Sequence, residues 1–442
     1  MCGIAGAFDV EKAFFILHDI LLHLQHRGQE SVGIVMDNFT SIKGHGLVKE
    51  VLTEKSFIEG HTGIGHVRYS TVGGTEEIQP LIGYTGKDKI AVAHNGTIPD
   101  AHKRRETILD RGAVFSTTVD SELFLHYVSI APFDDALESV LWTLQVIPAA
   151  YSVLVLHEQF MLGARDPYGY RPLFWGRYDG GYVVASEDSA LVALGATDIT
   201  EIKRGEVVLF ERGKEPKCIS LSVDKPGRFC VFEYIYFARP DSNLGGINVH
   251  KARFEMGRWL YKEHKIQADI VIPVLDSGLS GALGFSSESG IPMDFGLMRN
   301  RYMGRTFIMP TDRKSSVRKK LIPIPEVVKG KDVVLIDDSI VRGSTMGVIV
   351  SMLREAGARK VIVGIHSPPV KYPCFYGIDT ATRKELIASD HTIEEIRDVI
   401  GADELFYLSI EGLIKAVGRE DVCLACLNGH YDTWVPEVDS GV

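Results

Sequence analysis

The stretch VVLIDDSIVRGST, residues 333–345, runs from apolar residues into two adjacent carboxylates and then into a loop of small and hydroxyl residues. A continuous apolar run is typical of a strand buried on both faces, and the loop that follows favours a turn into a helix. The runs ADIVIPVL and KVIVGIHS, in the same half of the chain, also lead into turns or helices. We therefore predict a parallel, doubly wound α/β sheet for the second half.

The first half has a different pattern. Short apolar runs such as KIAVAHNG, GYVVASED and GEVVLFERG alternate with glycine-rich turns and predict strands. KAFFILHDILLHLQHRG and DSELFLHYVSIAPFDDALESVLWTLQ carry apolar residues at helical spacing, so we expect layered sheets and helices. The 442 residues, 45% of them hydrophobic, exceed what one core usually organises. The pattern changes near residues 222–229, which predicts domains at 2–225 and 226–442.

Composition excludes several classes of function. The formal net charge of -10 opposes a nucleic-acid-binding surface, which is normally basic. No apolar run approaches the roughly 18 residues that span a bilayer, and Asp9, Glu11 and Lys12 interrupt any signal peptide. Six cysteines in so long a chain do not form a disulfide scaffold. We expect a cytoplasmic protein that acts on small molecules, with neither a nucleic-acid nor a membrane partner.

Cys2 follows the initiator methionine directly. Removal of Met1 would give Cys2 a thiol and a free α-amino group, with reference pKa values of about 8.5 and about 7.7–8.0. One residue would then supply both the nucleophile and the base, as in N-terminal nucleophile enzymes. A cysteine at position 2 is more often incidental, so the hypothesis depends on the motifs that accompany it.

The motifs CGIAG, HRGQES, HVRYST, AHNG, VDSE and RDPYGYRPL follow one another through the first half. In this order they resemble the class II glutamine amidotransferase domain, over almost the whole first half. The resemblance implies an N-terminal nucleophile αββα fold in which Cys2 attacks the side-chain amide of glutamine. It also implies that Asn95 and Gly96 form the oxyanion hole. Arg68 would hold the α-carboxylate of glutamine and Asp120 its α-amino group.

Each of these motifs also has a simpler explanation. Asn-Gly favours a hairpin turn, and an isolated arginine or aspartate is usually a surface charge. The sequence departs from the family pattern at Thr97, where asparagine is usual, and at VDSE, where SDTE is more common. These departures bear on the fit of the substrate rather than on the reaction. We interpret His23 and His26 as structural residues that support the site.

The loop in 333–345 suits a phosphate group, because backbone N–H groups and hydroxyls precede a helix N-terminus. The paired carboxylates suit ribose hydroxyls or a bound Mg²⁺. The stretch lacks the lysine and glycine spacing of a Walker A motif, and it resembles the phosphoribosyl pyrophosphate (PRPP) motif of type I phosphoribosyltransferases. The alternative is a solvated Asp-Asp turn. The resemblance implies a PRPP site made of Asp337, Asp338, Ser339, Gly343, Ser344 and Thr345.

Two further segments of the second half fit a pyrophosphate-bearing substrate. IPVLDSGLSGALGF, residues 272–285, is another strand that leads into a Ser-Gly turn and a helix. The resemblance implies that Ser277 there holds Mg²⁺ with Asp337 and Asp338, although Leu275 replaces the usual proline. Residues 299–320 carry eight Arg or Lys against the single acid Asp312. Such a run can be a solvated face or touch RNA, but the resemblance implies a flap that closes over PRPP and completes an ammonia passage.

Four cysteines form a separate set: Cys230, Cys374, Cys423 and Cys426. Four thiolates can hold a Zn²⁺ ion or an iron–sulfur cluster, and sequence spacing does not separate the two; four unrelated buried cysteines are the simplest alternative. All four fall where the iron–sulfur subfamily of amidophosphoribosyltransferases has its ligands, which implies a structural [4Fe–4S] cluster. Cys218 matches no such position.

The whole chain thus resembles the amidophosphoribosyltransferase family. That resemblance implies that ammonia from glutamine displaces pyrophosphate from PRPP to give 5-phosphoribosylamine, the entry to purine synthesis. It also implies inhibition by purine nucleotides and a homotetramer. Two alternatives remain: an amidotransferase with another acceptor such as fructose 6-phosphate, which the 333–345 stretch argues against, and a non-catalytic PRPP-sensing regulator, which the presence of Cys2 and Arg68 argues against.

Overall fold

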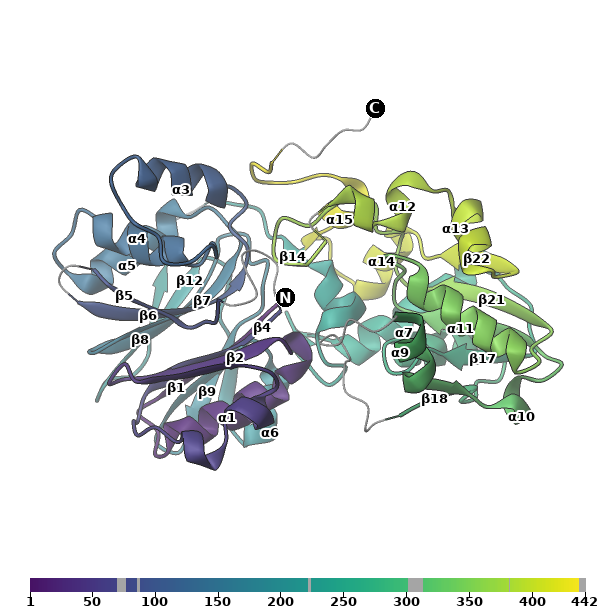
Figure 1. The fold of residues 1–442 in the computed structure, drawn as a ribbon, viewed down its shortest axis with the longest axis horizontal. Coiled ribbons are helices and arrows are strands. Elements are labelled where there is room, and N and C mark those ends of the chain that lie inside the picture. The colour runs from purple at the N-terminus through teal and green to yellow at the C-terminus, as the bar shows by residue number, and fades with distance from the viewer. Residues whose placement is uncertain (70–76, 86–87, 222–223, 301–312, 381, 437–442) are drawn as a thin grey trace.

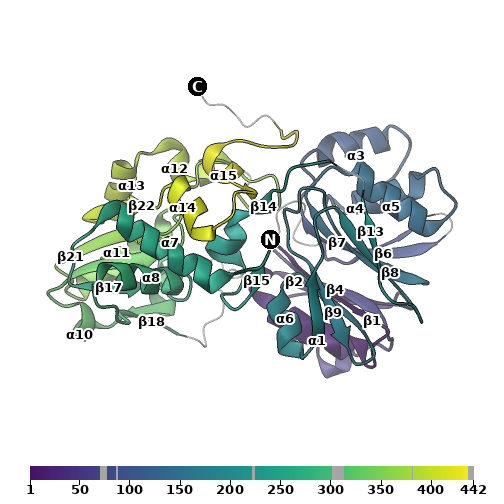
Figure 2. The ribbon, with the colours of Figure 1, turned by 180° about the vertical axis from the view of Figure 1, so that it is seen from behind.

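The computed structural model describes residues 1–436 except 70–76, 86–87, 222–223, 301–312 and 381. The chain forms two lobes that lie side by side, and its N-terminus lies between them in both views (Figures 1 and 2). The first lobe contains the N-terminal half of the chain and the second lobe contains the C-terminal half. The start of the chain is therefore at the junction of the two lobes.

Two antiparallel sheets form the first lobe. One has the order β11-β9-β10-β1-β4-β2-β3, from β1 (Gly3–Phe8), β2 (Ser31–Met36), β3 (Ser41–His45), β4 (Gly63–Arg68), β9 (Phe174–Tyr178), β10 (Gly181–Ala185) and β11 (Thr197–Glu201). The other has the order β13-β12-β8-β7-β6-β5, from β5 (Leu81–Tyr84), β6 (Lys89–Gly96), β7 (Tyr151–His157), β8 (Phe160–Arg165), β12 (Glu206–Glu211) and β13 (Lys217–Ser220).

Helices cover the outer face of each sheet. The two sheets share an apolar layer that includes Ile4, Leu154 and Phe210. Helices α1 (Ala13–His23) and α6 (Asp188–Leu194) pack on the first sheet, and α3 (Ala101–Leu109), α4 (Glu122–Ile130) and α5 (Ala136–Val146) pack on the second. Short turns of helix occur at η1 (Gln25–Arg27), α2 (Val48–Val51) and η2 (Glu54–Ser56). The αββα arrangement and both helical segments expected from the sequence are confirmed.

The second lobe is built on a parallel sheet of order β17-β20-β21-β22, from β17 (Ile270–Pro273), β20 (Asp332–Asp337), β21 (Lys360–Ile365) and β22 (Glu404–Tyr407). One face carries α7 (Val249–His264), α8 (Leu279–Ser289) and α14 (Ile410–Val417), and the other carries α11 (Ser344–Glu355) and α13 (Ile393–Ile400). Successive residues of β20 alternate between these faces: Val334 and Ile336 pack on the first, Val333 and Leu335 on the second. The apolar run in the sequence is therefore a strand buried on both faces.

Smaller elements join the lobes and edge the sheet: β14 (Phe229–Cys230), η3 (Glu233–Phe237), β15 (Asn243–Leu244), β16 (Ile247–Asn248), β18 (Leu297–Arg299), α9 (Arg313–Lys320), β19 (Leu321–Pro323), α10 (Pro325–Val328), η4 (Arg383–Glu385), α12 (Ile387–Asp390), β23 (Val422–Cys423) and α15 (Ala425–Asn428). The predicted domain boundary falls between β13 and β14, where 222–223 lie outside the described residues, and the division at 225/226 stays a prediction. Most of the expected flap, 301–312, is also outside them. Among the described residues, no helix has the length and apolar character required to cross a membrane.

Candidate active sites

Cys2 lies just before β1, between the two sheets of the first lobe, and is 7% exposed. Its backbone N–H donates to Oδ1 of Asn95 on β6 at 3.3 Å. Its Sγ atom is 3.6 Å from the carbonyl oxygen of Tyr69, which directly follows β4. The nitrogen that becomes the α-amino group when Met1 is removed is therefore already held by a side chain of the opposite sheet.

The Asn95 side chain is buried beside Cys2. The residue is fully buried, and its Oδ1 atom accepts from Cys2, but its Nδ2 atom has no hydrogen-bond partner among the described residues. A buried N–H group that stays unpaired costs stability, so this amide is suited to donate to an acceptor that arrives with the substrate. Gly96 follows with φ of +156°, and a Cβ atom there would lie 2.0 Å from the Ala150 carbonyl oxygen. Only glycine fits this position.

Strand register places Arg68 beside Cys2, and a hydrogen bond from Ile98 places Asp120 just beyond the end of β6. Gly3 pairs with Val67 in the antiparallel β1–β4 ladder, so Cys2 and Arg68 extend it as neighbours. Arg68 is almost fully buried and donates to the Glu77 carbonyl oxygen. Asp120 is also buried and accepts from the Ile98 N–H at 2.8 Å, two residues beyond Gly96. The structure thus gathers the five residues predicted for this site.

Two buried histidines, to which no role was assigned from the sequence, support this site. Burial lowers the pKa of His66 to about 3 and lowers the pKa of His94 from its ordinary value. His94 lies 2.9 Å from the Ser121 hydroxyl and 3.1 Å from the Ala150 carbonyl oxygen through its two ring nitrogens. Both rings are neutral at physiological pH and hold the backbone around Asn95 and Asp120.

Arg27 and Arg171 were not singled out from the sequence, although both lie in quoted motifs. Arg27 is fully buried, and its Nε atom donates to the Cys2 carbonyl oxygen at 3.0 Å. Arg171 donates from Nε to the Tyr376 carbonyl oxygen of the second lobe at 2.9 Å. Nearby, His26 contacts Glu187 at 2.7 Å, in line with its predicted supporting role. The presence of these arginines in the motifs HRGQES and RDPYGYRPL was the sequence signal that could have identified them.

The second candidate site lies at the carboxyl ends of β17 and β20, which are neighbours in the parallel sheet. The Ser277 hydroxyl donates to Oδ1 of Asp337 at 2.8 Å, and the backbone N–H of Asp338 donates to the same atom at 2.9 Å. The Ser339 hydroxyl donates to Oδ2 of Asp338 at 2.6 Å. Burial raises the pKa of Asp337 well above its ordinary value, and the adjacent Asp338 raises it further.

The loop after Asp338 ends at the N-terminus of α11. Gly343 caps this helix with φ of +74°, a conformation that favours glycine, and Ser344 and Thr345 form its first turn. The first N–H groups of a helix have no partner within the helix and attract anions. Phosphate oxygens can therefore bind here, beside the carboxylates.

These residues fit a magnesium ion. Mg²⁺ in substrate sites commonly takes one or two carboxylates and completes its shell with phosphate oxygens and water. Asp337 and Asp338 supply two adjacent carboxylates with the Ser277 hydroxyl in contact, and their mutual repulsion is what a cation would relieve.

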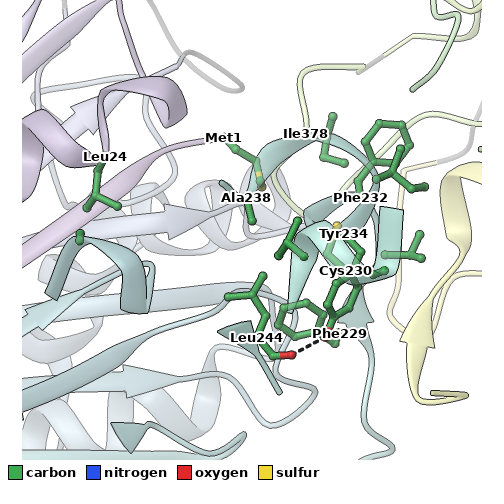
Figure 3. Close-up of a cluster of buried hydrophobic side chains, with 14 of the residues drawn as sticks. Met1, Leu24, Phe229, Cys230, Phe232, Tyr234, Ala238, Leu244 and Ile378 are labelled. Carbon is green, nitrogen blue, oxygen red and sulfur yellow. Dashed lines mark hydrogen bonds between the residues drawn. The ribbon is translucent and has the colours of Figure 1, made fainter. Parts of the chain in front are cut away.

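The four predicted cluster cysteines share one region at the junction of the lobes. The parallel pair β14–β23 places Cys230 opposite Cys423. The Tyr372 N–H donates to the Cys426 carbonyl oxygen at 3.1 Å, which brings the segment containing Cys374 alongside. Figure 3 shows Cys230 among Phe229, Phe232 and Tyr234. Cys218, by contrast, is exposed on β13.

The donor chemistry of this cysteine set fits Zn²⁺ or an iron–sulfur cluster, since both prefer thiolate ligands. Burial raises the pKa of Cys423 and Cys426 above the ordinary thiol value. In the part of the chain that the structure describes, no three His, Cys, Asp or Glu side chains lie close enough together to hold a metal ion. The four thiols are nevertheless gathered in one region, where they interact with one another electrostatically.

Comparisons with known proteins show which family the chain resembles. A family model described as a glutamine amidotransferase domain matches residues 66–193. An amidophosphoribosyltransferase from Pyrococcus horikoshii is 48% identical and aligns over 98% of this chain and 97% of its own length. A solved glutamine PRPP amidotransferase from Bacillus subtilis, complexed with ADP and GMP, is 44% identical, covers 99% of this chain and 98% of its own, and superposes with a TM-score of 0.92.

A second solved structure, described as the allosteric regulatory enzyme of purine biosynthesis, is 43% identical to this chain. It covers 99% of this chain and 97% of its own, and it also superposes with a TM-score of 0.92.

Proposed function

The chain belongs to the amidophosphoribosyltransferase family, and from this membership we propose that its two sites carry out the two halves of one reaction. The enzyme makes 5-phosphoribosylamine, glutamate and pyrophosphate from PRPP, glutamine and water, which is the first step of purine biosynthesis. The assignment of the glutamine half to Cys2 rests chiefly on the buried Asn95 amide, which lies beside Cys2 and has no partner among the described residues.

The glutamine half begins with the free amino acid held by Arg68 at its carboxylate and by Asp120 at its ammonium group. The Cys2 thiol attacks the side-chain amide carbon, and the α-amino group of the same residue takes up the thiol proton. The oxyanion that forms is held by Asn95 and Gly96; one good donor contributes about 3–4 kcal/mol. Ammonia leaves with that proton, and water then hydrolyses the thioester to glutamate.

Met1 must be removed before this can happen. In the full chain the Cys2 nitrogen is an amide, which is not a base, and the Met1 side chain lies buried at the junction beside Ala238 and Ile378 (Figure 3). Burial also lowers the pKa of the Met1 α-amino group to about 6. Intact-mass measurement of the purified enzyme is expected to show the loss of one methionine residue.

In the second half, PRPP lies across the carboxyl ends of β17 and β20. The loop of Ser339, Gly343, Ser344 and Thr345 binds phosphate oxygens, while Asp337 and Asp338 bind the ribose hydroxyls or the metal that contacts them. Ammonia attacks carbon 1 of the ribose as the bond to pyrophosphate breaks. Mg²⁺, held by Ser277, Asp337 and Asp338, would stabilise the negative charge on the departing pyrophosphate. We also propose that the basic segment 299–320, of which 301–312 lie outside the described residues, excludes water from this site and completes the ammonia passage.

Stoichiometry of the products tests this function. Pyrophosphate and glutamate are measured together on anaerobically purified, Met1-free protein supplied with PRPP and Mg²⁺, with and without glutamine. We expect pyrophosphate release to require glutamine or ammonia and to match glutamate formation one to one when glutamine is the donor. Glutamate without pyrophosphate would point to another acceptor, and the absence of both products would favour the non-catalytic regulator.

We also propose a [4Fe–4S] cluster on Cys230, Cys374, Cys423 and Cys426, with Zn²⁺ as the alternative. The proposal is supported by the donor set and by the family resemblance, and the cluster would tie the C-terminus to the junction. Iron, acid-labile sulfide and zinc measured on one anaerobic sample distinguish the two. We expect about four iron atoms per chain, lost in Cys426→Ser and kept in Cys218→Ser, whose thiol is exposed on β13. One zinc and no iron, or neither metal, would contradict the cluster.

Regulation and assembly complete the proposal. The related B. subtilis structure contains ADP and GMP, so we propose that purine nucleotides inhibit this enzyme. A homotetramer is proposed on the family resemblance, and light scattering measures it directly. All six cysteines are free, which is consistent with the reducing cytoplasm that we propose as its compartment.

A further inference from the structure

Arg27 holds the main chain of the nucleophile through a side chain that has no contact with solvent. Its Nε atom donates to the Cys2 carbonyl oxygen at 3.0 Å, while the Cys2 nitrogen donates to Asn95 on the other side of the residue. Cys2 is therefore fixed at both ends of its backbone. The position of the thiol relative to the Asn95 amide depends on where the Arg27 guanidinium is held.

Two buried carboxylates hold that guanidinium. Glu187, from the first lobe, accepts from Nη1 of Arg27 at 2.6 Å. Glu233, the first residue of η3 in the second half of the chain, accepts from Nη2 at 2.7 Å and from Nη1 at 3.0 Å. The two-pronged contact is the stronger and more directional of the two. Both carboxylates are completely buried.

The other neighbours of these carboxylates differ. Glu187 is also held by His26 at 2.7 Å, by the Ser242 hydroxyl at 2.6 Å and by the Arg239 N–H at 2.9 Å. Within the described ranges, Glu233 also pairs with Arg171 at 3.7 Å and interacts at longer range with Arg253. Glu187 is thus held by several hydrogen bonds besides those to Arg27, whereas the contacts of the Glu233 carboxylate are chiefly with Arg27 and Arg171. A buried arginine that loses its counter-charge must move or find another partner.

We infer that Glu233 is a positioning residue for glutamine hydrolysis: from the phosphoribosyltransferase half of the chain, it sets the place of Cys2 in the glutaminase half through Arg27. This inference rests on the proposed function of Cys2. It means that the glutaminase geometry is complete only when η3 is docked at the junction. Burial alone would lower the pKa of Arg27, but Glu233 and Glu187 raise it above its ordinary value, so its charge is permanent.

The test compares Glu233→Gln and Glu233→Asp in the full-length, Met1-free enzyme. The substitution replaces the carboxylate of Glu233 by a neutral amide of the same length. One of its two contacts with Arg27 is therefore lost and the other is weakened. We expect the kcat of glutamine hydrolysis to fall on the order of 100-fold, the effect of a displacement of about 1 Å at a reacting group. The KM for glutamine should stay within about twofold, because Arg68 and Asp120 are untouched. Ammonia-dependent pyrophosphate release should also stay within about twofold.

Glu215→Gln is the matched control. Glu215 also forms an ion pair with an arginine, Arg177, and both of these residues are in the first half of the chain; the Glu215 side chain is 74% exposed. Because exposed ion pairs contribute little, both activities of this variant should equal those of the wild type. The rate at which iodoacetamide alkylates Cys2, followed by mass spectrometry of the N-terminal peptide, gives a second readout. We expect this rate to change in Glu233→Gln and not in Glu215→Gln.

Several results would overturn the inference. These are wild-type kcat for glutamine in Glu233→Gln, an effect on KM alone, or equal loss of both activities. If Glu233→Gln does not fold, Glu233→Asp decides: it keeps the charge but shortens the side chain by one methylene, and about a 10-fold fall in kcat is expected. Wild-type kcat in that variant would reject the positioning role. Lack of ammonia-dependent release in the wild type would instead reject the proposed function.

Discussion

Cys2→Ala is expected to abolish glutamine-dependent pyrophosphate release and to leave the ammonia-dependent reaction within about twofold of the wild type. The expected loss is on the order of 10⁴-fold or more, because the variant has no nucleophile and the remaining binding and oxyanion groups give little catalysis alone. The fold should persist, since alanine fills most of the space of a small buried side chain and Asn95 can still accept from the residue 2 nitrogen. Steady-state rates with glutamine and with ammonium chloride measure both halves.

Cys218→Ala is the control for this experiment, because its thiol is exposed on the edge strand β13. It should match the wild type with either nitrogen donor. If Cys2→Ala lost both reactions equally, the division of labour between the two halves of the chain would be wrong. If it kept glutamine-dependent activity, another residue would be the nucleophile.

The sequence predicted the fold well because the main signals are local. The apolar run 333–336 indicated a strand buried on both faces, and β20 alternates between two cores as that pattern requires. The carboxyl ends of parallel strands meet at one edge of a sheet, so Ser277 and Asp337 could be expected together, and their hydrogen bond at 2.8 Å agrees.

What the sequence could not predict depends on contacts between distant segments. Arg27 and Glu233 are 206 residues apart, and no local periodicity indicates that one holds the other. The Nδ2 atom of Asn95 has no hydrogen-bond partner among the described residues because of its burial and surroundings. A motif identifies the residue but does not show which of its atoms are hydrogen-bonded. The protonation state of His66 follows from burial in the same way.

The cysteines also show what sequence spacing can and cannot predict. The spacing of Cys423 and Cys426 indicates a pair of thiols, and β14 and β23 bring Cys230 opposite Cys423. Whether the thiols surround a common centre depends on side-chain positions that sequence does not encode locally. Chemical analysis of iron, sulfide and zinc, rather than sequence, therefore tests the identity of the metal.

Asp337→Asn is expected to change stability and activity in opposite directions. In the metal-free protein, burial and the neighbouring Asp338 raise the pKa of Asp337, so ionisation of this group costs folding free energy at pH values above its unfolded pKa. Asparagine removes that cost, and the thermal unfolding midpoint measured without Mg²⁺ should rise. Pyrophosphate release should nevertheless fall on the order of 10²–10³-fold with glutamine and with ammonia alike, as expected when one group that stabilises charge in the transition state is lost.

Asp332→Asn separates this effect from a general change in the strand. Asp332 begins β20, at the opposite end from the site, and pairs with Arg359 at 2.7 Å. Its replacement should leave both rates near the wild type and should not raise the unfolding midpoint, because Arg359 lowers the pKa of Asp332 through a hydrogen bond.

Glutamate formation in Asp337→Asn, measured without PRPP, should persist because Cys2 and its neighbours are unchanged. An Asp337→Asn enzyme that released pyrophosphate at the wild-type rate would remove this carboxylate from the PRPP site, whereas a lowered unfolding midpoint would show that Asp338 and Asp337 stabilise rather than oppose one another in the metal-free fold.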